Sequence, residues 1–272
     1  MFTQFRLKNL YKEKVKVLLM QIKYNYVINL DRRQDRWADM TKIINDTCLK
    51  NYNFIRFSAI DGTKINEDLI THDLVDHKII NLLKENKISV SRGVIGCLLS
   101  HVSVLKKISE DSNLQDKDYV GIFEDDFNYS GSVDSFNKSY ETLIKTNLIE
   151  EDVEFLYIGG RFEPNFICFD DNVFTETSNI NIFLRGNRKN LKIDYYERTT
   201  SSYIIRKDCC KKVIDLISVN FLRKNAEVIA IDYVYTSLWK DIKLFDYFPH
   251  IFYAIRFYSS DVSNRNVKNI QF

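Results

Sequence analysis

Three consecutive carboxylates, Glu124, Asp125 and Asp126, follow the apolar run 119–123. This run is rich in aromatic and β-branched residues, which predicts a buried strand that ends at the carboxylates. Adjacent carboxylates repel one another unless a cation lies among them, and oxygen ligands suit hard divalent cations. The triplet therefore predicts a cation site, with Asp126 as the first ligand and Glu124 or Asp125 assisting. The alternative is a solvated acidic turn.

Polar residues also end two earlier predicted strands. The predicted strand 23–30 ends at Asn29 and Leu30, and the predicted strand 54–60 is followed by Asp61 in an Asp-Gly turn. Strands that alternate with helices favour a parallel sheet, and ligands of such sheets bind outside the carboxyl ends of the strands. We therefore expect these polar ends to meet the acidic triplet at one edge of the sheet.

The remaining pattern extends this alternation along the chain. Asp31 is the expected N-cap of the first helix, with Gln34 as its capping-box partner. The segment 165–196 is less regular, and the pattern marks no clean domain boundary. Predicted helices cover about 31–47, 67–85, 94–109, 133–145, 207–218 and 227–239, and predicted strands cover 153–158, 202–206 and one or two parts of 243–257.

The composition is that of an ordinary globular protein, with 272 residues, 45% hydrophobic and 28% charged. A net charge of +2 gives no general attraction to nucleic acid or to anionic membranes, so we expect no nucleic-acid partner.

The five cysteines form no CxxC pair, which indicates reduced thiols rather than a structural zinc site. A glycosylation sequon at Asn128 would place a glycan beside the acidic triplet. Segment 15–22 is too short and too polar to span a bilayer, and we find no signal peptide. These features predict a cytoplasmic protein without a transmembrane segment.

Six segments of the chain form a recognisable series: Tyr26–Arg36 (YVINLDRRQDR), Phe57–Gly62 (FSAIDG), Gly93–His101 (GVIGCLLSH), Ile122–Asp126 (IFEDD), Thr200–Ile205 (TSSYII) and Ile231-Asp232. In this order along the chain, they resemble the motifs of glycosyltransferase family 25. That family includes bacterial lipooligosaccharide galactosyltransferases, animal collagen galactosyltransferases and relatives in large viruses. The resemblance covers about residues 23–240, and Glu124 and Asp126 take the outer places of the usual Asp-x-Asp pattern.

This resemblance implies a GT-A type nucleotide-diphosphosugar fold with a mixed, largely parallel central sheet. Residues 23–258 would form its single domain, preceded by an extension (1–22) and followed by a tail (259–272). It also implies an inverting transfer of a hexose, galactose or else glucose, from a UDP-sugar with Mn²⁺ or another divalent cation. The acceptor hydroxyl would belong to a glycan or to collagen-type hydroxylysine. The alternatives are an inactive UDP-sugar-binding protein and a metal-dependent nucleotide phosphohydrolase.

The first motif supplies residues for the nucleotide. Asn29, Leu30 and Arg32 stand where they could hold the uridine, and Arg36 is a permanently charged donor for the diphosphate. A capped helix with exposed ion pairs explains the arginines equally well. Asp61 either accepts a hydrogen bond from the nucleoside or only completes the Asp-Gly turn.

The third motif places Arg92, Ser100 and His101 near the start of a helix, whose dipole would favour a diphosphate. His101 lies about two turns into that helix, where a structural role is the alternative to ligand contact.

Inversion requires one base that removes the proton of the acceptor hydroxyl. Asp232 is an acid in an otherwise apolar helix, where partial burial would raise its pKa, and it is the predicted base. A helix cap or a buried ion pair is the alternative. Tyr233 and Trp239 could form an aromatic platform for the acceptor, or belong to the core. His250 and Asp261 are further candidates for a metal or diphosphate contact.

Overall fold

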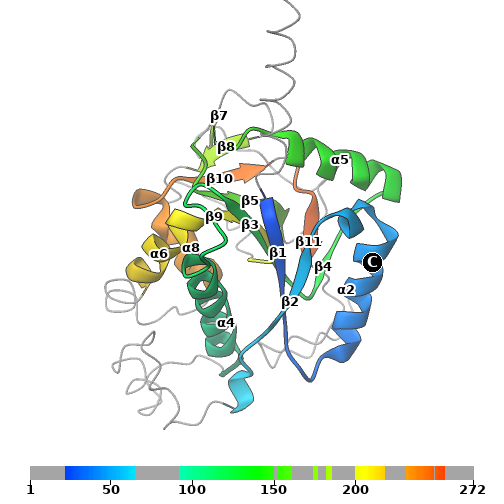
Figure 1. The fold of residues 1–272 in the computed structure, drawn as a ribbon, viewed down its shortest axis with the longest axis horizontal. Helices are drawn as coiled ribbons and strands as arrows, with labels where there is room; N and C mark the ends of the chain where they lie inside the picture. The colour runs from blue at the N-terminus through cyan, green and yellow to red at the C-terminus, as the bar shows by residue number, and fades with distance from the viewer. Residues whose placement is uncertain are drawn as a thin grey trace, which may run out of the picture.

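An eight-stranded sheet with the order β2-β1-β3-β9-β5-β10-β8-β7 forms the centre of the protein (Figure 1). The computed structural model describes residues 22–64, 92–149, 152–160, 174–176, 182–185, 200–217, 231–247 and 249–254. The strands are β1 (Ile22–Asn29), β2 (Phe54–Ser58), β3 (Tyr119–Glu124), β5 (Phe155–Tyr157), β7 (Phe174–Glu176), β8 (Ile182–Arg185), β9 (Ser202–Arg206) and β10 (Leu244–Tyr247).

The sheet is mixed and largely parallel. β1 pairs in parallel with β2 and β3, and β10 pairs in parallel with β5. β9 lies antiparallel between β3 and β5, and β8 lies antiparallel between β10 and β7. The other described strands of this sheet therefore run in one direction, as a GT-A type fold requires, and their carboxyl ends lie at one edge.

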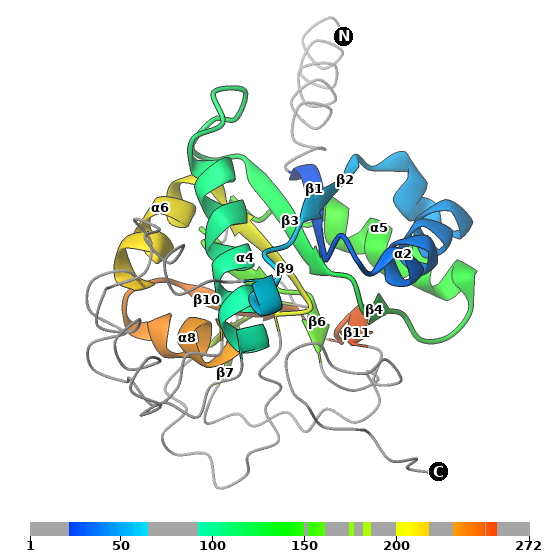
Figure 2. The same cartoon turned by 90° about the horizontal axis from the view of Figure 1, so that it is seen from below.

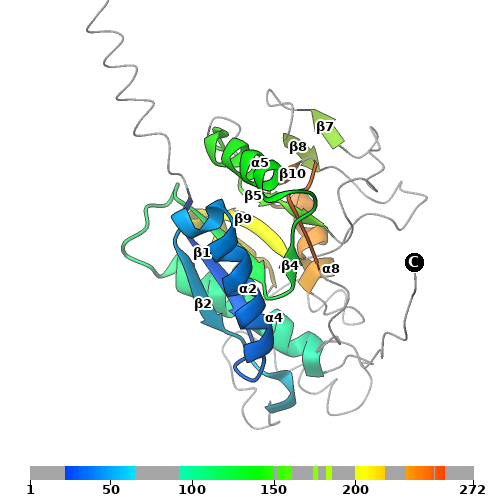
Figure 3. The same cartoon turned by 90° about the vertical axis from the view of Figure 1, so that its right-hand side faces the viewer.

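Helices cover both faces of the sheet, and Figure 3 shows α2 and α4 on opposite sides of β1 and β2. α4, α6 and α8 cover one face, while α2 and α5 cover the other. The helices are α2 (Gln34–Asp46), α4 (Arg92–Ser109), α5 (Val133–Lys145), α6 (Lys207–Leu216) and α8 (Ile231–Ser237), and short 3₁₀ turns occupy Cys48–Asn51, Gly62–Lys64 and Leu238–Lys240.

Alternation along β3 explains why it holds both layers together. Val120 and Ile122 pack into the core beneath α4, whereas Tyr119 and Phe123 pack into the core beneath α2 and α5. All four are fully buried, as expected for a central strand whose successive side chains point to opposite faces. The chain direction of β3 at Glu124 is therefore fixed by packing on both sides.

A small second sheet lies beyond the carboxyl ends of β3 and β5 (Figure 2). β4 (Phe127–Asn128) follows the acidic triplet, and β6 (Gly159–Gly160) follows β5 after one residue. Both pair with β11 (Phe252–Ala254), β4 in the antiparallel and β6 in the parallel sense. This pairing ties the turn that carries Asp125 and Asp126 to the end of the described chain.

Most predicted elements are confirmed within one to three residues, including the helix at 133–145 and the strand at 202–206. The predicted stretch 243–257 contains two strands, β10 and β11. The predicted helix 67–85, residues 1–21 of the predicted extension 1–22, the tail 259–272 and most of 165–196 lie outside the described residues. Among the helices that the structure describes, none is long and apolar enough to cross a membrane.

The predicted N-cap of the first helix is wrong. α2 begins at Gln34, and Arg33 occupies the N-cap without a side-chain hydrogen bond. The Asp31 carboxylate instead accepts hydrogen bonds from Arg56 and Ser58, both at 2.8 Å. Gln34 Nε2 donates to the Asp31 carbonyl at 2.7 Å. The local sequence predicts that the Asp31 side chain caps α2, but this side chain binds residues of the neighbouring strand β2 instead.

Candidate functional site

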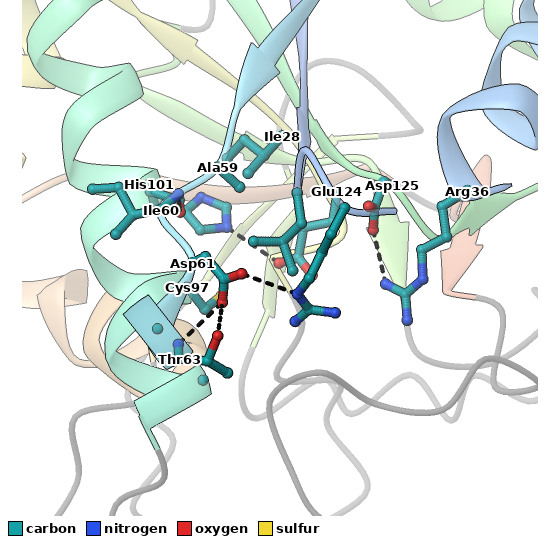
Figure 4. Close-up of a pocket in the computed structure, with 15 residues that line it drawn as sticks. Ile28, Arg36, Ala59, Ile60, Asp61, Thr63, Cys97, His101, Glu124 and Asp125 are labelled. Carbon is teal, nitrogen blue, oxygen red and sulfur yellow. Dashed lines mark hydrogen bonds and ion pairs between the residues drawn. The ribbon is translucent and has the colours of Figure 1, made fainter. Parts of the chain in front are cut away.

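A cleft opens at the carboxyl edge of the sheet, where the ends of β1, β2 and β3 meet the start of α4 (Figure 4). The polar ends of three predicted strands therefore meet, as the sequence pattern predicts. Four apolar residues, several charged groups and two glycines form its wall. The lining residues are Ile28, Leu30, Arg32, Arg36, Ala59, Ile60, Asp61, Gly62, Thr63, Gly93, Cys97, Ser100, His101, Glu124 and Asp125.

Glu124 is held by two side chains from opposite sides. Its Oε1 accepts a hydrogen bond from Thr200 Oγ1, just before β9, and lies 3.2 Å from His101 Nε2 on α4. Burial acts to raise the pKa of Glu124, but the interaction with His101, followed by the hydrogen bond from Thr200, brings this pKa below its usual value. Glu124 is therefore an oriented carboxylate, and its side chain remains 27% exposed.

Asp125 is engaged through both of its carboxylate oxygens. Oδ1 accepts from Arg36 Nη1 at 2.8 Å, and Oδ2 accepts from Asn29 Nδ2 at 2.7 Å. Burial raises the pKa of Asp125 despite the opposing charge of Arg36. Through these two hydrogen bonds, Asp125 joins Asn29 at the end of β1 to Arg36 on α2, and the turn after Glu124 is fixed.

Asp126 differs from its two neighbours. Its Oδ1 is buried, and the described residues offer this atom no hydrogen-bond partner. Burial, followed by the charges of Glu124 and Asp125, raises the pKa of Asp126 to about 8. A buried carboxylate oxygen without a donor, next to two other carboxylates, fits a cation ligand.

The loop after β2 packs closely on α4. A Cβ atom on Gly96 would lie 2.6 Å from Ile60 O and 2.7 Å from Gly62 N, so only glycine fits there. Ser100 Oγ accepts from the backbone N of Ile60 at 2.8 Å and donates to Gly96 O at 2.6 Å. These contacts hold the loop at a fixed height on the helix.

That fixed loop carries the rim of the cleft. Asp61 Oδ2 accepts from Arg32 Nε at 3.0 Å, and Asp61 Oδ1 accepts from the backbone and hydroxyl of Thr63 at 3.0 and 2.7 Å. Arg32 therefore lines the cleft beside Asp61, with 39% of its side chain exposed.

A buried polar chain runs from Glu124 into the core. His101 has no exposed surface, and its Nδ1 lies 2.8 Å from the hydroxyl of Tyr203 on β9. That hydroxyl lies 3.2 Å from the hydroxyl of Tyr235 on α8. This series of polar contacts connects the acidic motif with α4, β9 and α8, and it fixes the ring of His101.

Comparison with known proteins identifies the kind of protein that carries this cleft. Residues 22–265 match the family described as Glycosyltransferase family 25 (LPS biosynthesis protein). The chain belongs to glycosyltransferase family 25. The expected family is thereby confirmed.

Two curated proteins, both provisionally named glycosyltransferases, are similar to this chain. One, from Acanthamoeba polyphaga mimivirus, is 28% identical over 180 residues, which are 66% of this chain and 48% of the relative. The other, from Haemophilus influenzae, is 30% identical over 159 residues, 57% of this chain and 49% of the relative. The chain thus spans about half the length of the curated relatives it matches.

The structure brings most of the predicted site residues together. Nine of them line the cleft or pair with residues that do: Asn29, Leu30, Arg32, Arg36, Asp61, Ser100, His101, Glu124 and Asp125. Arg92 is exposed at the first residue of α4. The roles of these residues stay predictions.

Asp232 lies in the first turn of α8, which packs against α4, and it is only partly buried. The pKa of the Cys97 thiol in the cleft wall is raised chiefly by burial, then by the charge of Glu124 and then by the charge of Asp232. The side chains of Tyr233 and Trp239 and all of Asp261 lie outside the described residues.

His250 is buried away from the cleft lining, with Nε2 3.7 Å from Asp246 Oδ1.

Two residues of the site escaped the sequence argument. Thr200 precedes β9, and its contact with Glu124 depends on where β9 enters the sheet. Cys97 is mostly buried in the cleft wall one turn before His101. The sequence does contain a signal for Cys97, because it lies four residues before His101 on a predicted helix and therefore on the same helix face.

Proposed function

We propose that this glycosyltransferase transfers a hexose from a UDP-sugar to a hydroxyl acceptor with inversion, in a reaction that depends on a divalent cation such as Mn²⁺. Galactose is the first candidate sugar and glucose the second. The acceptor is a glycan or a hydroxylysine side chain.

The observation that carries the proposal is the state of Asp126. Its buried Oδ1 has no hydrogen-bond partner among the described residues, and two carboxylates adjoin it in sequence. Such an arrangement is unfavourable without a positive charge nearby. We assign Asp126 and the partly exposed Glu124 as the protein ligands of the cation. When bound, the cation neutralises the charge that develops on the diphosphate leaving group.

Residues around the acidic motif have separable tasks. Arg36 and Asn29 hold Asp125, so that this residue positions the turn instead of meeting the cation directly. Thr200 and His101 hold Oε1 of Glu124, which leaves Oε2 for a ligand. Fixed ligand geometry of this kind is what an oriented transfer reaction needs.

The two sides of the cleft suit the two parts of a nucleotide. Ile28, Leu30 and Ile60 give an apolar wall that can cover a uracil ring. Arg32, beside Asp61, is charged at every physiological pH and can bind a phosphate in a bidentate manner. Bound to a diphosphate, Arg32 would exchange its contact with Asp61 for the ligand.

Asp232 is the proposed base. It lies on the helix next to α4, close enough for its charge to act on Cys97 in the cleft wall. A partly buried carboxylate at this place can accept the proton of the acceptor hydroxyl as the oxygen attacks the anomeric carbon. The reduced cysteines and the sequon beside the motif support a cytoplasmic setting for the reaction.

Release of UDP from a panel of UDP-sugars, with Mn²⁺ and then with EDTA, tests the proposal. We expect slow hydrolysis of one donor with Mn²⁺, loss of that hydrolysis with EDTA, and acceleration by the correct acceptor. Phosphate release from UDP itself would indicate a phosphohydrolase instead. UDP binding without release from any donor, in the presence of candidate acceptors, would indicate an inactive binding protein.

A further inference from the structure

We propose that the cleft holds a second kind of metal site, in which Cys97, His101 and Glu124 bind a thiophilic divalent cation such as Zn²⁺. One donor atom from each residue, the Cys97 sulfur, a His101 nitrogen and a Glu124 oxygen, lies within 4.8 Å of the other two. Sulfur, imidazole and carboxylate together are a donor set for zinc and its relatives, rather than for Mn²⁺ or Mg²⁺.

Helix geometry places the first two ligands. Cys97 and His101 are four residues apart on α4, so their side chains lie one above the other on the same face. Figure 4 shows both at the wall of the cleft, with Glu124 opposite them at the end of β3. Zinc bonds of about 2.0–2.3 Å place tetrahedral ligand atoms roughly 3.5 Å apart. His101 Nε2 and Glu124 Oε1 already lie 3.2 Å apart. The Cys97 sulfur, within 4.8 Å of the other two donor atoms, therefore needs to approach them by about 1 Å, which rotation of its side chain can supply.

The buried tyrosines allow His101 to serve as a ligand. In one tautomer, Nε2–H donates to Glu124 and Tyr203 donates its hydroxyl hydrogen to Nδ1. In the other, Nδ1–H donates to the Tyr203 hydroxyl, which donates to Tyr235, and the lone pair of Nε2 points toward Glu124. The second tautomer forms when Nε2 loses its proton, Nδ1 gains one by exchange with solvent, and the two tyrosine hydroxyls reorient. It offers Nε2 as a ligand atom and supplies the outer hydrogen bond that metal-bound histidines require.

Three protein ligands leave one position of a tetrahedral ion for water, and the thiol releases its proton to solvent when the metal binds. Binding also takes Glu124, which we assign to the cation of the transfer reaction. Zinc should therefore inhibit transfer in competition with Mn²⁺. This consequence rests on the proposed function, whereas metal binding at the three residues does not.

Cobalt binding to the metal-free full chain tests the site without any donor or acceptor. Tetrahedral thiolate coordination gives a sulfur-to-cobalt charge-transfer absorption in the near ultraviolet, which Zn²⁺ should abolish by displacement. We expect this absorption in the wild type and in the control Cys48→Ser, whose thiol is buried in the other core. Cys97→Ser should lack it and bind Zn²⁺ at least about 100-fold more weakly, since even outer partners are worth 10–100-fold.

Tyr203→Phe is the second variant, because it keeps all three ligands and removes the hydroxyl that contacts His101 Nδ1 and Tyr235. It should keep the absorption and bind Zn²⁺ about 10–100-fold more weakly. Thermal melts establish that each variant is folded. Absence of the charge-transfer band in the wild type, or its persistence in folded Cys97→Ser, would overturn the assignment. If no UDP-sugar is hydrolysed, the proposed function is wrong. The cobalt experiment still shows whether Cys97, His101 and Glu124 bind a metal, because it needs no donor or acceptor.

Discussion

Asp126→Asn should stabilise the metal-free protein, although we assign Asp126 to the functional site. The pKa of this carboxyl is about 8 in the folded protein, because of burial and the nearby charges of Glu124 and Asp125, against 3.8 as its ordinary value. A folded-state pKa above the unfolded value means that ionisation of Asp126 opposes folding. The penalty is absent below about pH 4, grows as the pH rises, and reaches its maximum above about pH 8.

The size of the penalty follows from the same values. At pH 7 the carboxyl of Asp126 is ionised in the unfolded protein and must take up a proton on folding. Since pH 7 lies about three units above the ordinary pKa of 3.8, this proton uptake costs at most about 4 kcal/mol of folding free energy. Water near the partly exposed side chain reduces this to about 1–3 kcal/mol. The asparagine amide keeps the shape of the carboxylate and leaves the same buried oxygen without a donor. The comparison therefore isolates the charge.

Urea unfolding in EDTA, at several pH values between 4 and 8.5, measures the effect. We expect the unfolding free energy of Asp126→Asn to exceed that of the wild type by about 1–3 kcal/mol at pH 7, with the difference vanishing near pH 4. The melting temperature should rise by roughly 2–4 °C per kcal/mol. The exposed Asp241→Asn serves as the matched control and should change little. A variant that is less stable than the wild type at pH 7 would refute the reasoning.

Two further substitutions test the scaffold of the cleft. Arg36→Met leaves the buried carboxylate of Asp125 without its ion partner, and it should lower the unfolding free energy by about 3 kcal/mol in urea titrations. Adding Asp125→Asn should recover part of that loss; no recovery would mean that Arg36 acts through other contacts. Gly96→Ala forces a Cβ atom to within 2.6 Å of the carbonyl oxygen of Ile60, and it should cost about 1–3 kcal/mol in thermal melts. An unchanged melting temperature would show that the loop can move away from α4 freely.

The sequence predicts the parts of this protein that depend on local pattern. The apolar run before Glu124 predicts β3, and the Asp-Gly turn after β2 predicts the rim at Asp61. Their meeting at one edge follows from the general behaviour of parallel strands, and the cleft lining confirms it. Burial of both faces explains the continuous apolar character of β3.

Long-range placement is what the sequence does not predict. β9 lies antiparallel between β3 and β5. The pattern of residues 202–206 predicts a strand, but it does not predict which strands β9 pairs with. The contact of Thr200 with Glu124 depends on that pairing. For the same reason, the sequence does not predict the ion pair of Arg36 with Asp125, 89 residues away, and the contact of Arg36 with a diphosphate stays a prediction. Side chains that lie on different elements compete for partners, and only their positions in space decide the outcome.

Binding of UDP to the wild type and to Asp126→Asn, measured calorimetrically with saturating Mn²⁺ and with EDTA, tests the central claim most directly. The proposed cation site predicts that Mn²⁺ strengthens UDP binding to the wild type by at least about tenfold, or about 1.4 kcal/mol. Folded Asp126→Asn should bind UDP equally weakly in both conditions. If Mn²⁺ strengthens UDP binding to Asp126→Asn as much as to the wild type, the cation is not held by Asp126, and the account of this cleft is wrong.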